Sequence, residues 1–177
     1  EIKDCYFVNN YGTAASINFG LESTGFKLTV TGSTFEMNGY SLSLYCPFNV
    51  NNCTFQSEGS MSIGYSANGI MANNTIMSDV SVQSSDVKFV GNILNGAVTT
   101  LGDGKFTTSY NLISDASEEI TVDETDVKAA SELILGVLDQ EGAKTSDNGG
   151  FTPTIALLSD TLSDGRSIRV PLEETTV

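Results

Sequence analysis

Apolar and polar positions alternate along the first two thirds of the chain, and the alternation recurs at a nearly constant interval. Six short segments close on an apolar residue, at Phe7, Phe35, Phe55, Ile76, Leu94 and Ile113. These closing positions are 28, 20, 21, 18 and 19 residues apart. At most of the closing positions, apolar residues also lie five and seven positions earlier in the chain. Short alternating segments that repeat about every 20 residues predict stacked strands of a repeat protein.

A second column lies three positions before each closing residue and reads Asp4, Gly32, Asn52, Asn73, Gly91 and Tyr110. Five of these six residues are Asn, Asp or Gly, the types that adopt positive φ at low cost. The column therefore predicts a sharp bend between two strands. One position later, Asn74, Asn92 and Asn111 fall in the inward phase, and we expect their amides to stack as a ladder.

A further alternation follows each closing residue, with paired apolar positions at Ile17 and Phe19, Leu42 and Leu44, Met61 and Ile63, Val80 and Val82, and then Val98. Three short strands in each coil of about 20 residues predict an all-β, single-stranded right-handed parallel β-helix over residues 1–113. A β-sandwich has no reason to repeat residue types column by column. Because Ile2 already belongs to the pattern, we expect further coils upstream of Glu1.

Residues 114–177 are predicted to form a C-terminal capping segment, because the end of a strand stack needs cover. Asp126–Leu138 has an apolar stripe at helical spacing and a polar start, which predicts a short helix.

Two motifs resemble those of known families. Phe7-Val8-Asn9-Asn10 and Phe35-Glu36-Met37-Asn38 look like half of the repeat of polymorphic outer membrane proteins and related bacterial surface β-helices. The stretch from Asp147 to Leu158 is similar to the Asn-Gly-Gly-x-Thr-Pro-Thr run of secreted choice-of-anchor β-helix proteins, including many from Bacteroidetes. The resemblance implies an exported protein, secreted or on the outer cell surface.

The charge and composition of the chain disfavour several classes of partner and of site. Eight basic and 22 acidic residues give a net charge of −14, which disfavours nucleic acid and anionic membranes as partners. The chain has no histidine, which removes the usual general base and zinc ligand. It has no apolar stretch of membrane-spanning length. Three cysteines, Cys5, Cys46 and Cys53, are too few for a disulfide framework and are expected to be free thiols.

Two sets of residues are candidate binding sites. Tyr11, Tyr40, Tyr45 and Tyr65 lie on neighbouring coils and are suited to stacking on sugars, although a core role is an equal alternative. Asn38, Glu58 and Asp79 share an offset three positions after the closing residue and are candidate ligands for Ca²⁺. The alternative is that Glu58 and Asp79 belong to solvated polar turns and have no binding role.

Two functions remain after these exclusions. The first is a non-catalytic surface module for glycan or protein binding, adhesion or structural spacing, with no cofactor besides a possible Ca²⁺. The alternative is the C-terminal part of a polysaccharide-degrading enzyme, a glycoside hydrolase or lyase. The lack of histidine, and of arginine anywhere before Arg166, favours the first.

Overall fold

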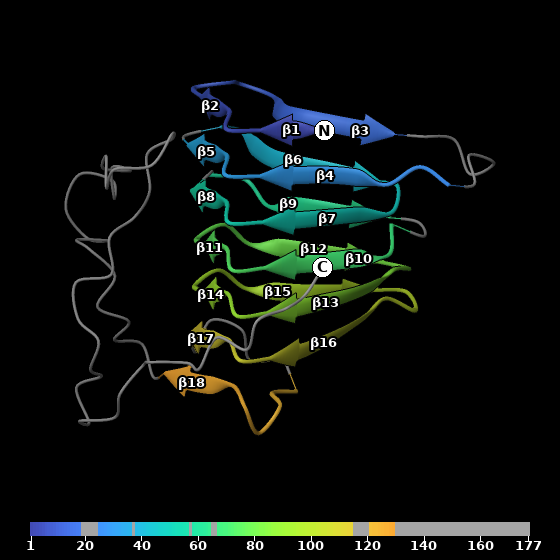
Figure 1. Cartoon of the computed structure of the whole chain (residues 1–177), viewed down its shortest axis with the longest axis vertical. Helices are drawn as coiled ribbons and strands as arrows, with labels where there is room; N and C mark the ends of the chain where they lie inside the picture. Colours follow the sequence, from blue (N-terminus) through green and yellow to red (C-terminus); the bar gives the residue numbers. More distant parts are fainter. Residues whose placement is uncertain (19–24, 37, 57, 65–66, 115–120, 130–177) are drawn as a thin grey trace.

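The computed structural model of the 177-residue chain describes residues 1–18, 25–36, 38–56, 58–64, 67–114 and 121–129. Within these ranges the regular elements are β-strands, which pair in parallel and form three sheets of six, seven and five strands. We name them sheets A, B and C. The strands of each sheet lie one above the other along the molecule (Figure 1). The predicted all-β parallel solenoid is confirmed.

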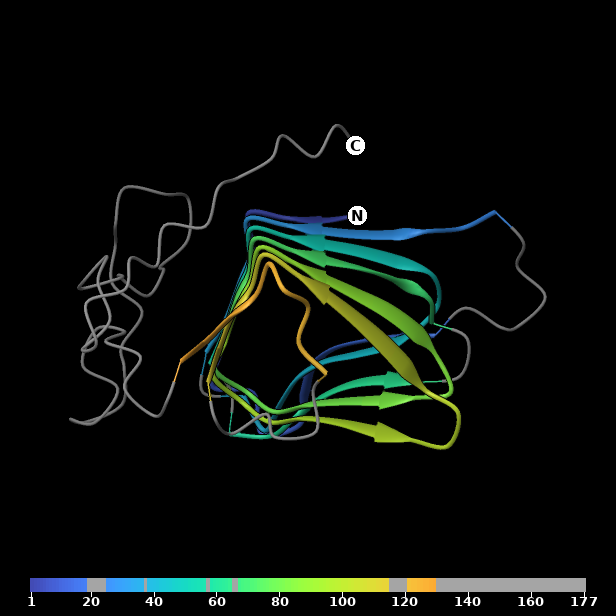
Figure 2. The same ribbon diagram turned by 90° about the horizontal axis from the view of Figure 1, so that it is seen from below.

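Sheet A consists of β1 (Ile2–Lys3), β4 (Leu28–Thr31), β7 (Phe48–Asn51), β10 (Gly69–Ala72), β13 (Asp86–Val90) and β16 (Lys105–Ser109). Sheet B consists of β2 (Tyr6–Val8), β5 (Thr34–Glu36), β8 (Thr54–Gln56), β11 (Thr75–Ile76), β14 (Ile93–Leu94), β17 (Leu112–Ser114) and β18 (Val127–Ala129). Sheet C consists of β3 (Thr13–Asn18), β6 (Tyr40–Tyr45), β9 (Met61–Gly64), β12 (Val80–Gln83) and β15 (Val98–Leu101). The chain visits A, B and C in turn, and the three sheets form three sides around one interior (Figure 2).

The strand register agrees with the columns read from the sequence. In sheet B the closing residues pair directly, from Phe7 with Phe35 down to Leu94 with Ile113. In sheet A the column that starts at Ile2 pairs through Val30 and continues down to Thr108. Equivalent residues of successive coils therefore lie one strand spacing apart, about 4.8 Å.

The predicted bend between sheets A and B is present in every coil that the sequence aligned. All six residues of the bend column have positive φ, between 51° at Asp4 and 66° at Gly91. Even Tyr110, a residue type that rarely adopts this conformation, has a φ of 57°. The bend turns the backbone without a loop, so the strands of sheets A and B follow each other closely.

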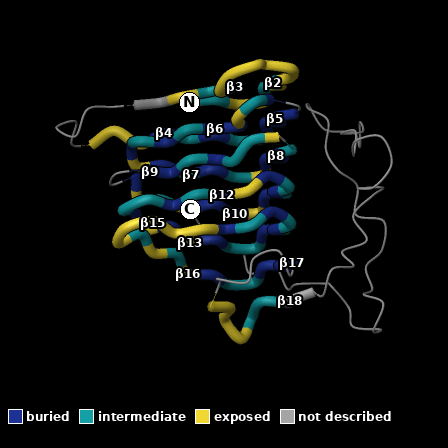
Figure 3. Tube along the Cα trace, turned by 180° about the vertical axis from the view of Figure 1, so that it is seen from behind, coloured by how far each residue is buried: buried dark blue, intermediate teal, exposed yellow. Residues whose placement is uncertain are grey.

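The interior is filled by the inward side chains of all three sheets. Phe7, Phe35 and Phe55 form a stack with ring centroids 4.8 and 4.9 Å apart. Phe35 and Phe55 are fully buried, as are Val50, Leu44 and most other inward residues. Along the Cα trace, buried inward positions follow the coils while exposed positions gather at turns and ends (Figure 3).

The predicted asparagine ladder runs beside this apolar core. Asn92 is 1% exposed, and its amide makes four hydrogen bonds. Its Nδ2 donates to the Met71 carbonyl at 2.8 Å and to Asn111 Oδ1 at 3.0 Å. Its Oδ1 accepts from the backbone N–H of Asn74 at 2.9 Å and from Asn74 Nδ2 at 3.0 Å. A primary amide has two donors and two acceptor sites, so Asn92 is fully satisfied.

The two ends of the ladder differ in chemistry. Upstream, Asn74 Oδ1 accepts the backbone N–H of Cys53 at 2.9 Å. Downstream, Asp126 Oδ1 accepts both the backbone N–H of Asn111, at 2.8 Å, and Asn111 Nδ2, at 2.9 Å. An ionised carboxylate accepts and does not donate, so Asp126 satisfies the last asparagine without needing an acceptor beneath it.

The structure corrects two sequence-based expectations. In sheet C, Leu42 and Leu44 pair with Ala15 and Ile17, so the equivalent apolar pair is not Ile17 and Phe19. The predicted helix from 126 to 138 does not begin at its expected start, because residues 127–129 form β18, which pairs with the open edge of β17. Residues 130–177, which include the rest of the range predicted as helix and most of the predicted capping segment, lie outside the described residues. The described part of the chain has no helix long and apolar enough to span a membrane.

Candidate functional site

The four tyrosines proposed for ligand stacking do not form one surface. Tyr11 lies between β2 and β3 and is fully solvent-exposed, whereas Tyr40 begins β6 and is 52% exposed. Tyr45 lies at the other end of β6, about 16 Å away at the usual strand rise, and is partly buried. Tyr65 lies outside the described residues. Only Tyr11 and Tyr40 are brought together, at the corner between sheets B and C.

A depression of about 530 Å³ lies at this corner and is lined by Asn9, Asn10, Tyr11, Gly39 and Glu58. We call it the corner depression; Tyr40 follows Gly39 in the chain. Backbone hydrogen bonds join the successive coils here, from Gly39 N to the Asn10 carbonyl at 2.8 Å and from Glu58 N to the Asn38 carbonyl at 3.1 Å. The depression therefore combines side chains from two coils with the Gly39 backbone of the coil between them.

Two glycines allow the coils to approach closely at this corner. A Cβ on Gly39 would lie 2.6 Å from the Tyr11 carbonyl oxygen, and a Cβ on Gly59 would collide with the Gly39 carbonyl oxygen. The Cβ position of Gly59 is also 2.9 Å from Cδ1 of Tyr40, so that ring lies close to the Gly59 backbone. Any larger residue at either position would push the coils apart beside Tyr11.

A buried amide holds the turn that carries Tyr11. Asn38 is fully buried, and its Oδ1 accepts the backbone N–H of Asn10 at 3.1 Å and Asn10 Nδ2 at 2.7 Å. Asn38 Nδ2 donates to the Phe7 carbonyl at 3.0 Å. Asn9, beside it, has a φ of 56°, which suits a tight turn. Asn10 and Asn38 each lie three positions after a closing residue, and this shared offset is the sequence signal for the pair. Asn38 therefore braces a turn, whereas the sequence pattern predicts it as a calcium ligand.

The calcium ligands proposed from the sequence are spread over different environments. Both acceptor sites of Asn38 Oδ1 are already used by Asn10. Val80 pairs with Met61, so Asp79 lies opposite Ser60 instead of Glu58, because the turn after β8 is longer than the turn after β11. Asp79 Oδ1 accepts the N–H of Ala97 at 2.8 Å. The described residues contain no metal-holding group of three or more His, Cys, Asp or Glu side chains. The calcium site stays a prediction.

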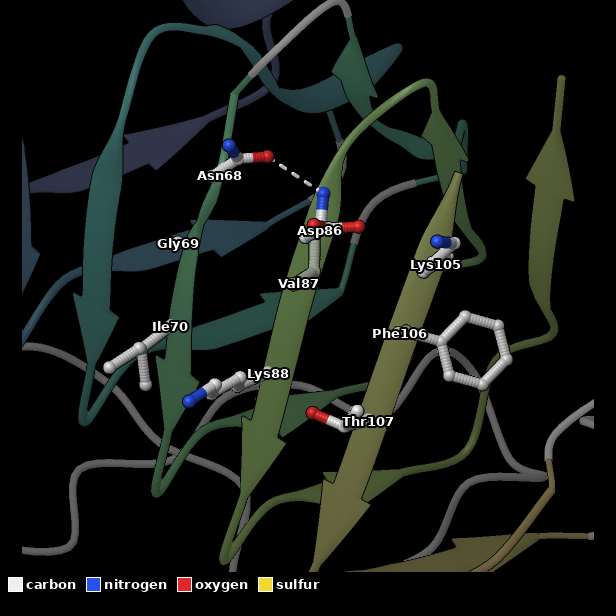
Figure 4. Close-up of a pocket in the computed structure, with 9 residues that line it drawn as sticks. All are labelled: Asn68, Gly69, Ile70, Asp86, Val87, Lys88, Lys105, Phe106 and Thr107. Carbon is white, nitrogen blue, oxygen red and sulfur yellow. Dashed lines mark hydrogen bonds between the residues drawn. The ribbon is translucent and has the colours of Figure 1, made fainter. Parts of the chain in front are cut away.

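A second depression, of about 510 Å³, crosses strands β10, β13 and β16 of sheet A (Figure 4). Its outer row consists of Ile70, Lys88 and Thr107, which pair across the three strands. At the rim of the depression, Asn68 Oδ1 accepts a hydrogen bond from the backbone N–H of Asp86 at 2.8 Å. In the strand register Asp86 on β13 lies opposite Lys105 on β16. We call this surface the sheet A groove. Sequence reasoning missed it; the available signal was two lysines on neighbouring coils.

The cysteines are free thiols. Cys46 and Cys53 are buried, whereas Cys5 is partly exposed. Burial raises the pKa of the Cys53 thiol to about 11, and burial also raises the pKa of Cys46. A buried thiol with a raised pKa is a poor nucleophile at neutral pH.

Comparison with known proteins found no matching family model, no matching curated protein and no matching solved structure.

Proposed function

We propose that this protein is a non-catalytic module of an exported, cell-surface β-helix, and that it binds glycans at the corner depression. The observation that carries the proposal is the fully exposed ring of Tyr11 in one depression with the carboxylate of Glu58 and the amides of Asn9 and Asn10. An aromatic ring provides a flat apolar face for the C–H side of a sugar. Carboxylate and amide groups provide hydrogen-bond partners for its hydroxyls.

The form of the site supports binding of a chain end or a short stretch of glycan. Its volume falls in the range of small-ligand sites, about 300–1,000 Å³. Its floor is a turn braced by the buried Asn38 amide, which keeps the neighbouring groups in place before a ligand arrives. Adhesion or spacing at the cell surface would use the same rigid stack of coils.

The test is titration of the full chain with neutral oligosaccharides, followed by NMR or calorimetry. Tyr11→Ala is expected to weaken binding about three- to tenfold, which corresponds to one lost aromatic contact of about 0.5–1.5 kcal/mol. Tyr11→Phe keeps the ring and is expected to retain binding. Leu101→Ala is the control, because Leu101 is likewise a large exposed side chain, at 52%, but lies on β15 at the far end of sheet C.

Two results would overturn the proposal. Binding that is equally strong in Tyr11→Ala and Leu101→Ala would place the ligand elsewhere. New reducing ends or unsaturated products in the same incubations, lost in Glu58→Gln, would show catalysis at this corner and replace the binding function by an enzymatic one.

A further inference from the structure

The corner depression and the sheet A groove differ in charge. The described turns between sheets B and C cover residues 9–12, 38–39, 58–60, 77–79 and 95–97; they contain Glu58 and Asp79 and no lysine or arginine. The sheet A groove, in contrast, is lined by Lys88 and Lys105 as well as Asp86. The corner depression is therefore the more negative of the two, within a chain whose net charge is already −14.

The carboxylate of Glu58 is available to a ligand. Glu58 is exposed and lines the corner depression. Within the described part of the chain its carboxylate makes no ion pair and no hydrogen bond, and only its backbone N–H is bonded, to the Asn38 carbonyl. Asp79 lies on the next coil at the same corner, where a hydrogen bond from Ala97 holds its carboxylate.

An ammonium group interacts more strongly with the Glu58 carboxylate and the Tyr11 ring than a hydroxyl group does. A cation is attracted by the carboxylate, forms a charge-assisted hydrogen bond with it, and is also attracted to the face of a tyrosine ring. A neutral sugar obtains only ordinary hydrogen bonds and ring contact there. The field of an acidic protein further concentrates cations near its surface. A glycan that carries carboxylates would meet the opposite effect.

We infer that the corner depression selects glycans with free amino groups, of the glucosamine type, over the corresponding neutral sugars. The inference rests on the proposed function, because it names the sugar class that the same site takes. Tyr11 contacts the sugar ring, and Glu58 pairs with its ammonium group.

The experiment compares two oligosaccharides that differ only in charge. The full chain is titrated with a glucosamine oligomer and with the N-acetylglucosamine oligomer of the same length and linkage, near pH 6 and at low and high salt. At low salt the glucosamine oligomer is expected to bind about five- to tenfold more tightly, through one charge-assisted contact together with a cation–π contact. High salt is expected to reduce this preference, because the charges are exposed and screened.

Variants separate the local contact from the general field. Glu58→Gln is expected to remove most of the preference, because it weakens binding of the glucosamine oligomer by more than it weakens binding of the N-acetylated oligomer. Asp86→Asn is the matched control, because it removes the same charge from the sheet A groove and is expected to keep the preference. Tyr11→Ala is expected to weaken both oligomers.

Each alternative outcome has a distinct meaning. Equal binding of the two oligomers would overturn the inference and leave the proposed glycan-binding function standing. Binding of neither, nor of other neutral oligosaccharides, would overturn both. A preference for glucosamine that Glu58→Gln and Asp86→Asn reduce equally would show attraction by net charge alone, and would overturn the inference for this site.

Discussion

Replacement of Asn92 by leucine tests whether the asparagine ladder stabilises the solenoid. The two side chains are similar in size, so the change removes hydrogen bonds without opening a large cavity. In Asn92→Leu the backbone N–H of Asn74 and one N–H of its amide lose their acceptor. The Met71 carbonyl and Asn111 Oδ1 each lose a donor. All of these groups lie in the interior, where water cannot replace the lost partner.

The expected loss of stability follows from these unpaired groups. A buried donor without an acceptor costs about 1–3 kcal/mol, so the two donors together cost about 2–6 kcal/mol. Burial of the leucine side chain offsets part of this, by about 1.5–3 kcal/mol. We expect a net loss of about 1–3 kcal/mol. For a chain of this length the corresponding decrease in Tm is about 2–12 °C.

The measurement is urea unfolding followed by circular dichroism, together with the thermal midpoint. Asn49→Leu on β7 is the matched control: it makes the same amide-to-isobutyl change, but Asn49 Oδ1 is buried without a hydrogen-bond partner. Removal of that oxygen leaves no donor unpaired, and we expect a change within about 1 kcal/mol.

An unchanged midpoint for Asn92→Leu would refute the ladder as a stabilising element. Equal losses in Asn92→Leu and Asn49→Leu would also refute it, since the effect would then come from leucine in a strand and not from the hydrogen bonds between coils.

Two further predictions concern the close approach of the coils and the buried thiol. Gly59→Ala is expected to cost about 1–3 kcal/mol in urea unfolding, because the new Cβ collides with the Gly39 carbonyl oxygen, whereas Gly12→Ala, with no atom within 4 Å of its Cβ, is expected to change stability by less than about 1 kcal/mol. Equal effects of the two would contradict the packing. Burial raises the pKa of Cys53 from 9.0 to about 11, so the native thiol stays protonated where the unfolded thiol ionises, and its contribution to stability is full below pH 9 and falls as pH rises toward 11. Iodoacetamide is therefore expected to label Cys53 at pH 8 far more slowly in the native chain than in urea, and equal rates would show that this thiol is accessible.

The sequence by itself determined the features that repeat from coil to coil. Core positions must be apolar and the bend needs a residue that tolerates positive φ, and these two requirements recur from coil to coil. A buried amide needs hydrogen-bond partners above and below it, and this requirement recurs in the three successive coils that carry Asn74, Asn92 and Asn111. Each requirement therefore appears as a column that can be read without coordinates. The pairings of Phe7 with Phe35 and of Asn92 with Asn111 were predictable for this reason.

Only the tertiary structure decided what depends on unequal turns. Glu58 and Asp79 share an offset in the sequence, but the longer turn after β8 separates their register. Asp126 joins the ladder 15 residues after Asn111, a spacing outside the repeat of about 20 residues, so its role as terminal acceptor was not visible in the pattern. The close approach of the coils beside Tyr11 likewise depends on Gly39 and Gly59, whose Cβ positions are occupied by atoms of the neighbouring coil. Outward turns carry no shared packing requirement, so their lengths vary, and their side chains meet only where the folded coils place them.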